Sequence, residues 1–389
     1  MTTNEALRKL AARAKQVGAL ALDTEFMGEG RYRTELCLVQ VAVETDEPDE
    51  PAWTELIDPF DREIDPAPIV ALIDDPEVEI IVHAGRQDLA LLRRLWHAQP
   101  RNCFDTQIAA AFAGMRAQIG YEALLRDLLR VQLDKGASFS QWDTRPLSDA
   151  QQSYARGDVL QLNQVATVLK DRLRERGRLD WAREECLPLE ASTDERDIDV
   201  IFAKLPKIGV ISGEQRATAR ALVIWREECA DREDKPVQKV LADAAIVEVA
   251  KRQPIDDRQL REMRGIHDGI ARRRGAAIVN VVTSAADNPP IASQRSDRTQ
   301  SDPGDAALIV LAESLVRARA VQEDLAYELL ATRADLQAVV SAVRDHGPDP
   351  DVRTLRGWRR AVVGDELLAL LQGERSLRID QQLRVVVAD

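Results

Sequence analysis

The sequence predicts a mixed α/β domain followed by a chain that is almost entirely helical, and three observations indicate this fold class. Apolar runs with strand character dominate the first 60 residues. Helical and strand-like patterns then alternate as far as about residue 174. Beyond that point, two polar stretches interrupt a helical pattern. Strands first and alternating elements afterwards predict a mixed sheet with helices on both faces, joined by linkers to small all-α domains.

The elements of the α/β domain follow from the spacing of its apolar residues. Leucines recur at helical intervals between residues 87 and 96, whereas residues 36–42 form a continuous apolar run typical of a buried strand. The same criteria predict strands at residues 20–26, 36–42, 54–58, 79–83 and 102–105, the first three as an antiparallel meander. They predict helices at residues 1–16, 66–74, 87–96 and 106–114, and further helix to about residue 174, broken by a loop at 134–146.

The helical half of the chain contains two blocks that resemble each other. Residues 241–266 and 330–358 share a pattern in which an Arg-Gly pair falls at the same turn, at Gly265 and Gly357. A repeat of this size indicates a duplicated small domain. The predicted boundaries are residues 1–190 for the α/β domain, 191–204 for a linker, 205–284 for the first helical domain, 285–303 for a second linker and 304–389 for the second helical domain.

Composition bounds the class of protein. A chain of 389 residues is too long for one compact core, which favours two or three domains. No run of about 18 uncharged apolar residues exists, so no membrane partner is expected, and residues 1–16 lack the apolar block of a secretory signal. A cytoplasmic location is therefore expected. The four cysteines form no Cys-x-x-Cys pair, which favours neither a zinc site nor a disulfide framework.

The charge is distributed unevenly. The net charge of −13 argues at first against a polyanionic partner. Residues 1–203 carry 24 Lys and Arg against 37 Asp and Glu, whereas residues 204–283 carry 16 against 12. The acidic excess lies in the α/β domain, and a locally basic helical domain follows it.

The stretch 20–26 contains the strongest chemical signal, the pair Asp23 and Glu25. Residues two apart on a strand leave the same face of the sheet. Two such carboxylates about 4 Å apart repel by roughly 4 kcal/mol at an effective dielectric near 20, and a divalent metal converts this repulsion into attraction. The alternative is that Asp23 ends the strand as a turn former while Glu25 points into water.

Three further residues extend this pattern. Asp88 follows a short strand and enters the first turns of the next helix, where a structural alternative is a favourable charge at the helix N-terminus. Tyr154 and Asp158 lie four apart, so both project from one helical face. Their alternatives are a half-buried core aromatic and a solvated helix residue. Gly157 destabilises a helix interior by about 1 kcal/mol relative to Ala, and its presence suggests that another group approaches the helix closely there.

Taken in order, Asp23-x-Glu25, Asp88 after His83-Ala84-Gly85, and Tyr154-x-x-x-Asp158 resemble the three motifs of the DEDDy family of exonucleases, specifically ribonuclease D. The likeness covers residues of about 18 to 175. It continues through Leu36-x-Leu-x-Gln40, Phe104-Asp105-Thr106-Gln107, Leu133-Asp134-Lys135 and Trp142-x-x-Arg145-Pro146-Leu147. The two helical blocks resemble the helicase and ribonuclease D C-terminal domain, abbreviated HRDC.

This resemblance implies a fold, a cofactor and a reaction. The fold is an α/β ribonuclease H-like exonuclease domain followed by two HRDC domains. Asp23, Glu25, Asp88 and Asp158 are implied to bind two divalent cations, Mg²⁺ with Mn²⁺ also accepted, and Tyr154 to orient the attacking water. The implied reaction is 3'-to-5' hydrolysis of RNA that releases nucleoside 5'-monophosphates, with the 3' ends of tRNA and other structured RNA precursors as substrates.

Two other functions compete with this reading. A proofreading-type DNA exonuclease shares the carboxylates but is usually joined to polymerase or helicase parts, for which this chain has no room. A non-catalytic RNA-binding scaffold would have no physical reason to keep four mutually repelling carboxylates.

Weaker signals surround these motifs. Thr24 is expected on the opposite strand face from its acidic neighbours, His83 either lines the pocket or ends a strand, and Asp105 either supports the site or caps a helix. Trp142 and Arg145 either contact RNA, as a base stack and a phosphate ligand, or pack within their loop. The candidate RNA-binding residues of the basic domain are Arg264, Arg272, Arg273 and Arg274, with a solvated helix face as the alternative.

Overall fold

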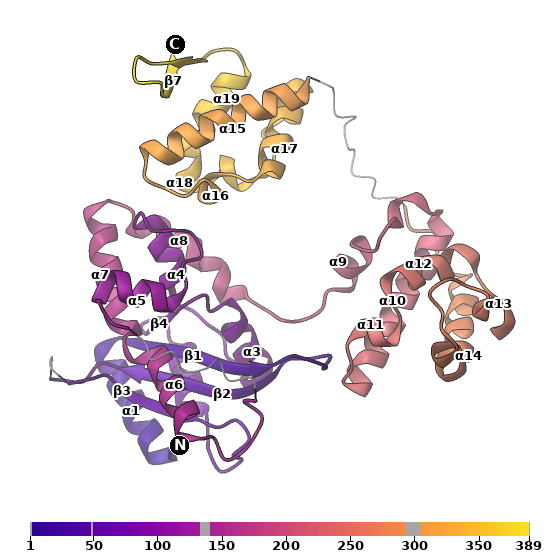
Figure 1. Cartoon of the computed structure of the whole chain (residues 1–389), viewed down its shortest axis with the longest axis horizontal. Coiled ribbons are helices and arrows are strands. Elements are labelled where there is room, and N and C mark those ends of the chain that lie inside the picture. Colours follow the sequence, from indigo (N-terminus) through magenta and orange to yellow (C-terminus); the bar gives the residue numbers. More distant parts are fainter. Residues whose placement is uncertain (1, 48–49, 133–140, 293–303, 389) are drawn as a thin grey trace. The chain divides into compact units, whose positions relative to one another are not determined.

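A computed structural model of the chain describes residues 2–47, 50–132, 141–292 and 304–388 (Figure 1). These residues belong to two compact units. Unit 1 combines residues 1–25 and 36–193 with the C-terminal stretch 299–389, and unit 2 combines residues 26–35 with 194–298. The larger parts of the predicted loop 134–146, with Lys135, and of the predicted linker 285–303 lie outside the described residues.

Unit 1 is built on a five-stranded mixed sheet with the strand order β3-β2-β1-β4-β5. Its strands are β1 (Ala19–Met27), β2 (Glu35–Val43), β3 (Trp53–Ile57), β4 (Glu79–Val82) and β5 (Cys103–Asp105). β4 pairs in parallel with both β1 and β5, whereas β2 and β3 are antiparallel. The five predicted strands are confirmed to within one residue at each end. The order places β1, which carries Asp23 and Glu25, in the middle of the sheet.

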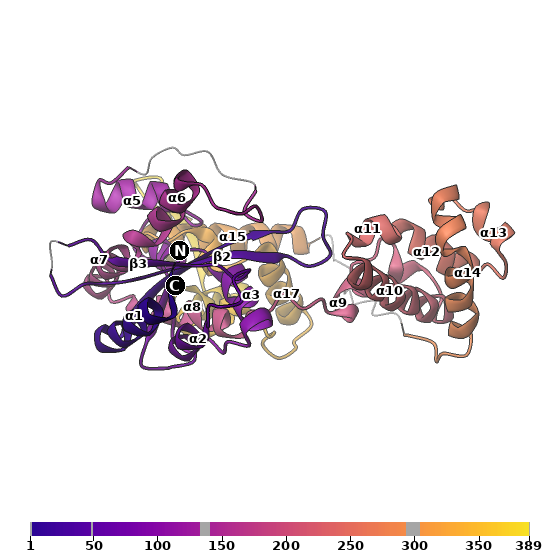
Figure 2. The ribbon, with the colours of Figure 1, turned by 90° about the horizontal axis from the view of Figure 1, so that it is seen from below.

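Helices cover both faces of this sheet, as predicted. One core joins Leu20, Leu22 and Val41 to the helices α1 (Asn4–Val17), α2 (Ala67–Ile73) and α3 (Arg86–Trp96). A second core joins Ala21 and Ala42 to the helices α4 (Thr106–Phe112), α5 (Tyr121–Leu129), α6 (Asp149–Leu160), α7 (Leu162–Glu175) and α8 (Leu179–Cys186). Figure 2 shows α5 and α6 on one side of the strands and α1 and α2 on the other. Alternating residues of β1 therefore enter two different cores, as strand geometry requires.

The C-terminal stretch of unit 1 packs against the helices of the second core. Its elements are α15 (Asp305–Gln322), α16 (Tyr327–Leu330), α17 (Arg333–Arg344), α18 (Gly357–Arg359), α19 (Asp365–Leu371), β6 (Ser376–Ile379) and β7 (Val385–Ala388). The Trp358 ring stacks on Trp181 at a centroid distance of 5.0 Å and meets the edge of Phe112 at 5.1 Å. The side chain of Arg359 forms an ion pair with Glu185.

The prediction that the second half is purely helical was wrong for its last residues. β6 and β7 form an antiparallel hairpin in which Ile379 faces Val385. A short run rich in β-branched residues favours this arrangement, and Asp380, which accepts backbone hydrogen bonds from Gln382 and Arg384, closes the turn. Apolar residues in the stretch 376–388 do not recur at helical spacing, and this feature of the sequence favours strands over a helix.

Apart from residues 26–35, the regular elements of unit 2 in its described residues are helices. Its helices are α9 (Ile198–Ala203), α10 (Gly213–Glu233), α11 (Val237–Val240), α12 (Asp243–Arg252), α13 (Asp257–Arg261) and α14 (Asp268–Ala285). Arg226 is only 1% exposed and pairs with Glu227 and Asp243. The order of a long helix, a one-turn helix and a helix of 10 or 12 residues is shared by α10–α12 and α15–α17. Gly265 and Gly357 both have positive φ angles, as the proposed repeat requires of equivalent turns.

Shorter turns complete the fold: η1 (Leu187–Ala191), η2 (Ile208–Val210), η3 (Arg353–Leu355) and η4 (Arg360–Gly364). Within the described part of the chain, every helix falls short of the length or the apolar character that crossing a bilayer requires.

Candidate active site

The acidic cluster forms where the middle of the sheet meets α6. The fully buried residues Leu20, Ala21 and Leu22 hold the first part of β1 in the core. Further along the strand, Asp23 and Glu25 lie two residues apart, so their side chains leave the same face of the sheet. Asp158 reaches the same place from α6, whose start is fixed by a capping box between Ser148 and Gln151. One carboxylate oxygen from each of the three acids lies within 4.8 Å of the others.

Asp88 approaches this group from the first turn of α3 and is 6% exposed. Thr24 lies between Asp23 and Glu25 in the sequence, is 5% exposed, and its Oγ1 donates a hydrogen bond to Asp88 Oδ1. Asp88 is not one of the three closely grouped acids, but its charge raises the pKa values of both Asp23 and Glu25. Thr24 therefore holds a fourth carboxylate beside the cluster.

Burial is the main cause of the raised pKa values of these four carboxyl groups. It raises the pKa of Glu25 to about 8, with Asp158 and Asp88 adding to the effect. It also raises the pKa of Asp158 to about 7 and that of Asp88 to about 6, where the hydrogen bond from Thr24 opposes the rise. The pKa of Asp23 lies well above its ordinary value because of burial and because of Asp88, Asp158 and Glu25. Ionising all four together requires added positive charge.

The residues at this site fit divalent cations. All the candidate ligands are carboxylate oxygens, which hard cations such as Mg²⁺ and Mn²⁺ prefer. Several buried side-chain atoms of unit 1 make no hydrogen bond within the described part of the chain, and both amide atoms of Gln40 are among them. Burial, followed by the charges of Asp158 and Asp23, raises the pKa of the Tyr121 phenol.

Tyr154 lies one helical turn before Asp158 on α6. Its ring centroid is 6.1 Å from that of Trp142. Burial, followed by the charges of Asp158 and Glu25, raises the pKa of Tyr154 to about 12. The phenol therefore keeps its proton at neutral pH and can donate a hydrogen bond beside the acids.

A clamp of hydrogen bonds fixes the turn that leads into α3. The carboxylate of Asp105 accepts the backbone N–H groups of Ala84 and Gly85, each at 3.0 Å, and also caps α4. Ala84 has φ of 56°, and a Cβ on Gly85 would lie 2.4 Å from Val82 Cβ. Asp105 therefore caps α4, as one of the two alternatives expected, and its bonds to Ala84 and Gly85 also fix the turn that leads to Asp88.

The neighbouring His83 is held by two hydrogen bonds. Its Nδ1 lies 2.9 Å from Thr106 Oγ1 and its Nε2 lies 3.1 Å from the Ile119 carbonyl oxygen. Burial lowers its pKa. Both ring nitrogens are thus used inside the protein, which favours a structural role for His83 at the strand end.

The loop before α6 holds Trp142 and Arg145 inward. Trp142 is 3% exposed. Arg145 forks onto Asp58, with Nε to Oδ2 at 2.5 Å and Nη2 to Oδ1 at 2.7 Å, and also donates to the Cys37 carbonyl oxygen at 2.6 Å. In this arrangement both side chains support the loop on which α6 begins, and neither presents a free group to RNA.

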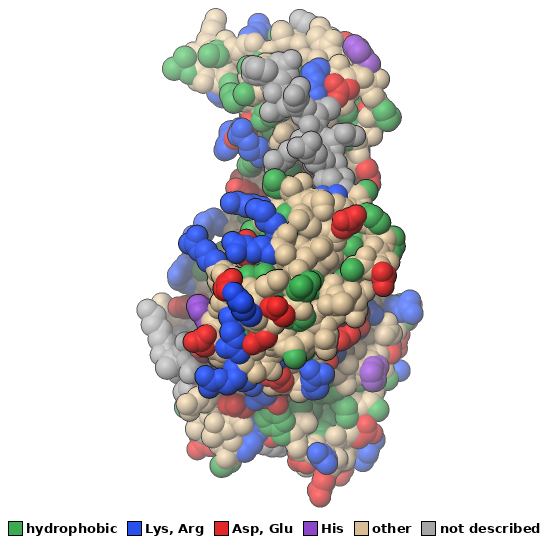
Figure 3. All heavy atoms as spheres, turned by 90° about the vertical axis from the view of Figure 1, so that its right-hand side faces the viewer, with side chains coloured by type: hydrophobic (Ala, Val, Ile, Leu, Met, Phe, Trp, Pro, Cys, Tyr) green, Lys and Arg blue, Asp and Glu red, His purple; other side chains and the backbone are tan. Residues whose placement is uncertain are grey.

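The four arginines of unit 2 differ in their surroundings. Arg264, Arg272 and Arg273 are exposed. Arg274 is partly covered and pairs with Glu233 at 2.8 Å. Figure 3 shows Lys and Arg side chains gathered on one part of the surface that faces the viewer. Arg264, Arg272 and Arg273 are thus the more accessible members of the predicted set.

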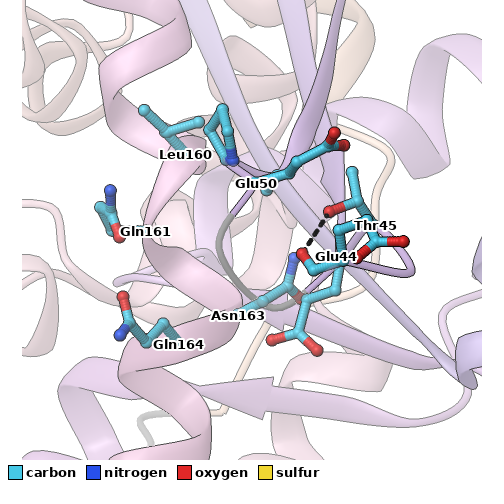
Figure 4. A pocket seen from close by; sticks show the side chains of 10 residues that line it. Glu44, Thr45, Glu50, Leu160, Gln161, Asn163 and Gln164 are labelled. Carbon is cyan, nitrogen blue, oxygen red and sulfur yellow. Dashed lines mark hydrogen bonds between the residues drawn. The ribbon is translucent and has the colours of Figure 1, made fainter.

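A separate pocket of about 250 Å³ lies where the loop after β2 meets the start of α7 (Figure 4). Its lining includes Glu44, Thr45, Gln161 and Asn163, and Thr45 Oγ1 donates to the Glu47 carbonyl oxygen at 3.1 Å. It contains none of the four candidate ligands, so it is distinct from the acidic cluster.

The sequence alone gave no signal for Tyr121 and used Gln40 only as part of a resemblance. The surroundings of both residues depend on contacts between elements far apart in the sequence, which residue spacing within one element does not reveal. The hydrogen bond from Thr24 to Asp88, across 64 residues, was missed for the same reason.

Comparison with known proteins agrees with these features. Residues 1–174 match a sequence family described as 3'-5' exonuclease, and residues 215–282 match the HRDC domain. The chain is 35% identical to ribonuclease D of Gluconacetobacter diazotrophicus, over 98% of this chain and 94% of that relative. It is 34% identical to ribonuclease D of Granulibacter bethesdensis, over 99% and 96%. The crystal structure of Escherichia coli RNase D, described as an exoribonuclease involved in structured RNA processing, has a TM-score of 0.81 at 26% identity, covering 96% of this chain and 98% of that one.

Proposed function

The chain belongs to the ribonuclease D family of 3'-to-5' exoribonucleases, and we propose that its active site is the cluster of Asp23, Glu25, Asp88 and Asp158, holding two divalent cations. The observation that carries this proposal is the convergence of three carboxylate oxygens within 4.8 Å, drawn from β1 and α6. The three grouped acids hold one cation. Asp88, whose charge acts on Asp23 and Glu25, contributes to the second.

Mg²⁺ is the proposed physiological ion, with Mn²⁺ able to replace it, because both accept all-oxygen ligand sets. Two divalent cations supply positive charge that stabilises the attacking and leaving oxygens of a phosphodiester displacement and lower the pKa of the attacking water. The protein supplies rigid placement of the carboxylates through β1, the cap of α6 and the turn held by Asp105. The products are nucleoside 5'-monophosphates.

Tyr154 is proposed to position the attacking water by donating a hydrogen bond. A phenol whose pKa is about 12 is a poor general base at neutral pH, so a donor role agrees better with its surroundings. Its place one turn from Asp158 puts the two side chains on the same face of α6, which supports this role.

The proposed substrates are the 3' ends of structured RNA, including tRNA precursors. The related Escherichia coli enzyme, which is described as acting in structured RNA processing, supports this class. We further propose that residues 304–389 form a second HRDC domain, because α15–α17 repeat the helix order of α10–α12. Unit 2, with Arg264, Arg272 and Arg273 exposed, is the proposed RNA-binding domain.

The test is a time course on matched RNA and DNA oligomers labelled at the 5' end, with Mg²⁺, with Mn²⁺ and with chelator. We expect a ladder that shortens from the 3' end of RNA, only when a cation is present. Asp23→Asn and Asp158→Asn should lower the rate at least about 10³-fold while the circular dichroism spectrum is retained. Equal rates on RNA with chelator present, or full activity of both variants, would refute the ligand assignment. Faster degradation of DNA would favour the proofreading alternative.

A further inference from the structure

The pocket between the loop after β2 and the start of α7 has the composition of a binding site for a positively charged molecule (Figure 4). Its volume is about 250 Å³, whereas one water molecule occupies about 30 Å³ of the liquid. The pocket is therefore large enough for a small organic ligand. Of the described residues that line it, three are glutamates and none is Lys or Arg.

The three glutamates of this pocket, Glu44, Glu47 and Glu50, are exposed, and none of their carboxylates pairs with a cation among the described residues. Their neighbour Asp46, which does not line the pocket, instead forms an ion pair with Arg13. Three carboxylates around one cavity attract cations from solution. A cation that enters the pocket therefore meets negative charge that the protein itself leaves without a partner.

The spacing of these carboxylates does not suit a single metal ion. Within the described part of the chain, the acids whose oxygens come within 4.8 Å of one another are Asp23, Glu25 and Asp158. Oxygen ligands lie about 2.0 to 2.6 Å from a bound Mg²⁺ or Ca²⁺, so the ligands of one ion have to converge. The glutamates of the pocket do not converge in this way. A ligand that carries several separated positive charges fits them better.

A buried acceptor in the same pocket provides an independent indication of a ligand. Asn163 lines the pocket and is only 4% exposed. Its Nδ2 donates to the Ala42 carbonyl oxygen at 3.2 Å, whereas its Oδ1 has no hydrogen-bond partner among the described residues. A buried acceptor without a donor lowers stability, and most such groups in proteins are paired. The N–H group of a ligand would supply the missing donor.

The rest of the lining is partly apolar. Pro51, Ala52 and Leu160 contribute hydrocarbon surface to the pocket. Such surface packs favourably against methylene groups, while the glutamates favour the charged ends of the same molecule. Together, the lining matches a flexible hydrocarbon chain that bears ammonium groups.

We propose that this pocket binds an aliphatic polyamine. Its ammonium groups donate hydrogen bonds to the three glutamates and to Asn163 Oδ1, and its methylene groups pack against Leu160 and Pro51. Gln161, which also lines the pocket, caps the C-terminus of α6. The ligand thus joins the loop after β2 to the end of the helix that carries Asp158, and it stabilises the folded protein by binding it.

The experiment titrates spermidine into the full chain by calorimetry, in saturating Mg²⁺ so that the acidic cluster holds its cations. Glu44→Gln combined with Glu50→Gln removes two charges from the pocket. Asp46→Asn combined with Glu77→Gln is the matched control, because it removes two charges from residues of unit 1 outside the pocket. Butylamine, which has one ammonium group, tests whether several charges are needed. The unfolding temperature is measured with and without each amine.

We expect spermidine to bind the wild type with one site and to raise its unfolding temperature. E44Q/E50Q should bind spermidine at least about 5-fold more weakly, the combined effect of two ion pairs at a partly exposed site. D46N/E77Q should bind within about 2-fold of the wild type. Butylamine should bind at least about 10-fold more weakly than spermidine. RNA hydrolysis without amine should be unchanged in E44Q/E50Q.

Three results would overturn the proposal. If E44Q/E50Q and D46N/E77Q bind spermidine equally well, the glutamates are only a solvated surface. If Asp23→Asn abolishes spermidine binding and E44Q/E50Q does not, the amine occupies the acidic cluster instead of the pocket. If butylamine binds as tightly as spermidine, one ammonium group is sufficient, which would favour a lysine side chain of another protein as the occupant.

Discussion

At the scale of single residues, the proposed active site gathers acidic groups whose charge the fold alone does not neutralise. Asp23, Glu25, Asp88 and Asp158 all have raised pKa values, with burial as the first cause in each case. Added protons or added cations can relieve the same repulsion. Stability, pH and metal binding are therefore linked at this site.

This linkage predicts a dependence of stability on pH. An acid whose pKa is raised on folding contributes stability that is present below its unfolded pKa, near 4, and lost as pH rises through its folded value. For Glu25 and Asp158 those folded values are about 8 and about 7. In chelator, the free energy of unfolding should thus fall between pH 4 and pH 8, and one pKa unit corresponds to about 1.4 kcal/mol.

The measurement is urea unfolding at pH 5 and pH 8, in chelator and in Mg²⁺, for the wild type and Asp158→Asn. The variant cannot ionise at this position, so its stability should decline less in chelator. Mg²⁺ should reduce the decline of the wild type more than that of the variant. Identical pH dependence of the two proteins in chelator would contradict the electrostatic account.

Tyr154→Phe tests the role of the phenol. Removing the hydroxyl should lower kcat by roughly 10- to 100-fold, within the range of losses seen when one positioned hydrogen-bonding or proton-transfer group is removed. KM for RNA should change little, because the ring is retained against Trp142. Steady-state kinetics on a short oligoribonucleotide measure both constants. A rise in KM with kcat unchanged would assign Tyr154 to substrate binding.

At the scale of elements, the strands and the site-bearing helices could be predicted from the sequence because their signals are local. The apolar runs of β1 and β2 and the leucine spacing of α3 each determine an element without reference to the rest of the chain. The candidate carboxylates could be selected because the order and spacing of the three motifs are visible in the sequence itself. Gln40 and Tyr121 could not be placed in this way, since their surroundings depend on which strands adjoin and which helices cover them.

The turn before α3 shows how an element positions a candidate ligand, Asp88. Gly85 precedes Arg86, the first residue of the helix, and a Cβ there would lie 2.4 Å from Val82 Cβ. Gly85→Ala should therefore shift the turn, lower the free energy of unfolding by about 1 to 3 kcal/mol and reduce activity through Asp88. Chemical denaturation and the RNA assay measure the two effects.

Gly120→Ala is the matched control, because a Cβ at Gly120 meets nothing within 4 Å. It should change stability by less than about 1 kcal/mol and leave the rate of RNA hydrolysis unchanged. If G85A and G120A behave alike, the close packing at Gly85 has no bearing on the position of Asp88.

At the scale of the whole molecule, the exposed arginines of unit 2 predict how RNA affinity responds to salt. Changing Arg264, Arg272 and Arg273 to Ala should weaken RNA binding and make the slope of log affinity against log salt less steep by about 2. This figure follows because each phosphate contact on a single strand contributes roughly 0.7 to the slope. Fluorescence anisotropy over a range of KCl concentrations gives this slope.

Arg274→Ala is the comparison variant, because Arg274 pairs with Glu233 inside unit 2. Its main effect should be on the stability of this unit, with the salt slope close to that of the wild type. An unchanged slope in the triple variant would mean that these arginines form only a solvated helix face.

The aromatic contact of Trp358 in α18 with Phe112 in α4 and Trp181 in α8 limits how this protein can be truncated. A shortened protein ending before residue 304 would leave Phe112 and Trp181 without the indole of Trp358, and these rings would then face water. Such a fragment should be prone to aggregation and its nuclease half to local unfolding. Point substitutions on exposed residues of the C-terminal stretch would therefore measure its contribution to RNA handling more cleanly than deletion.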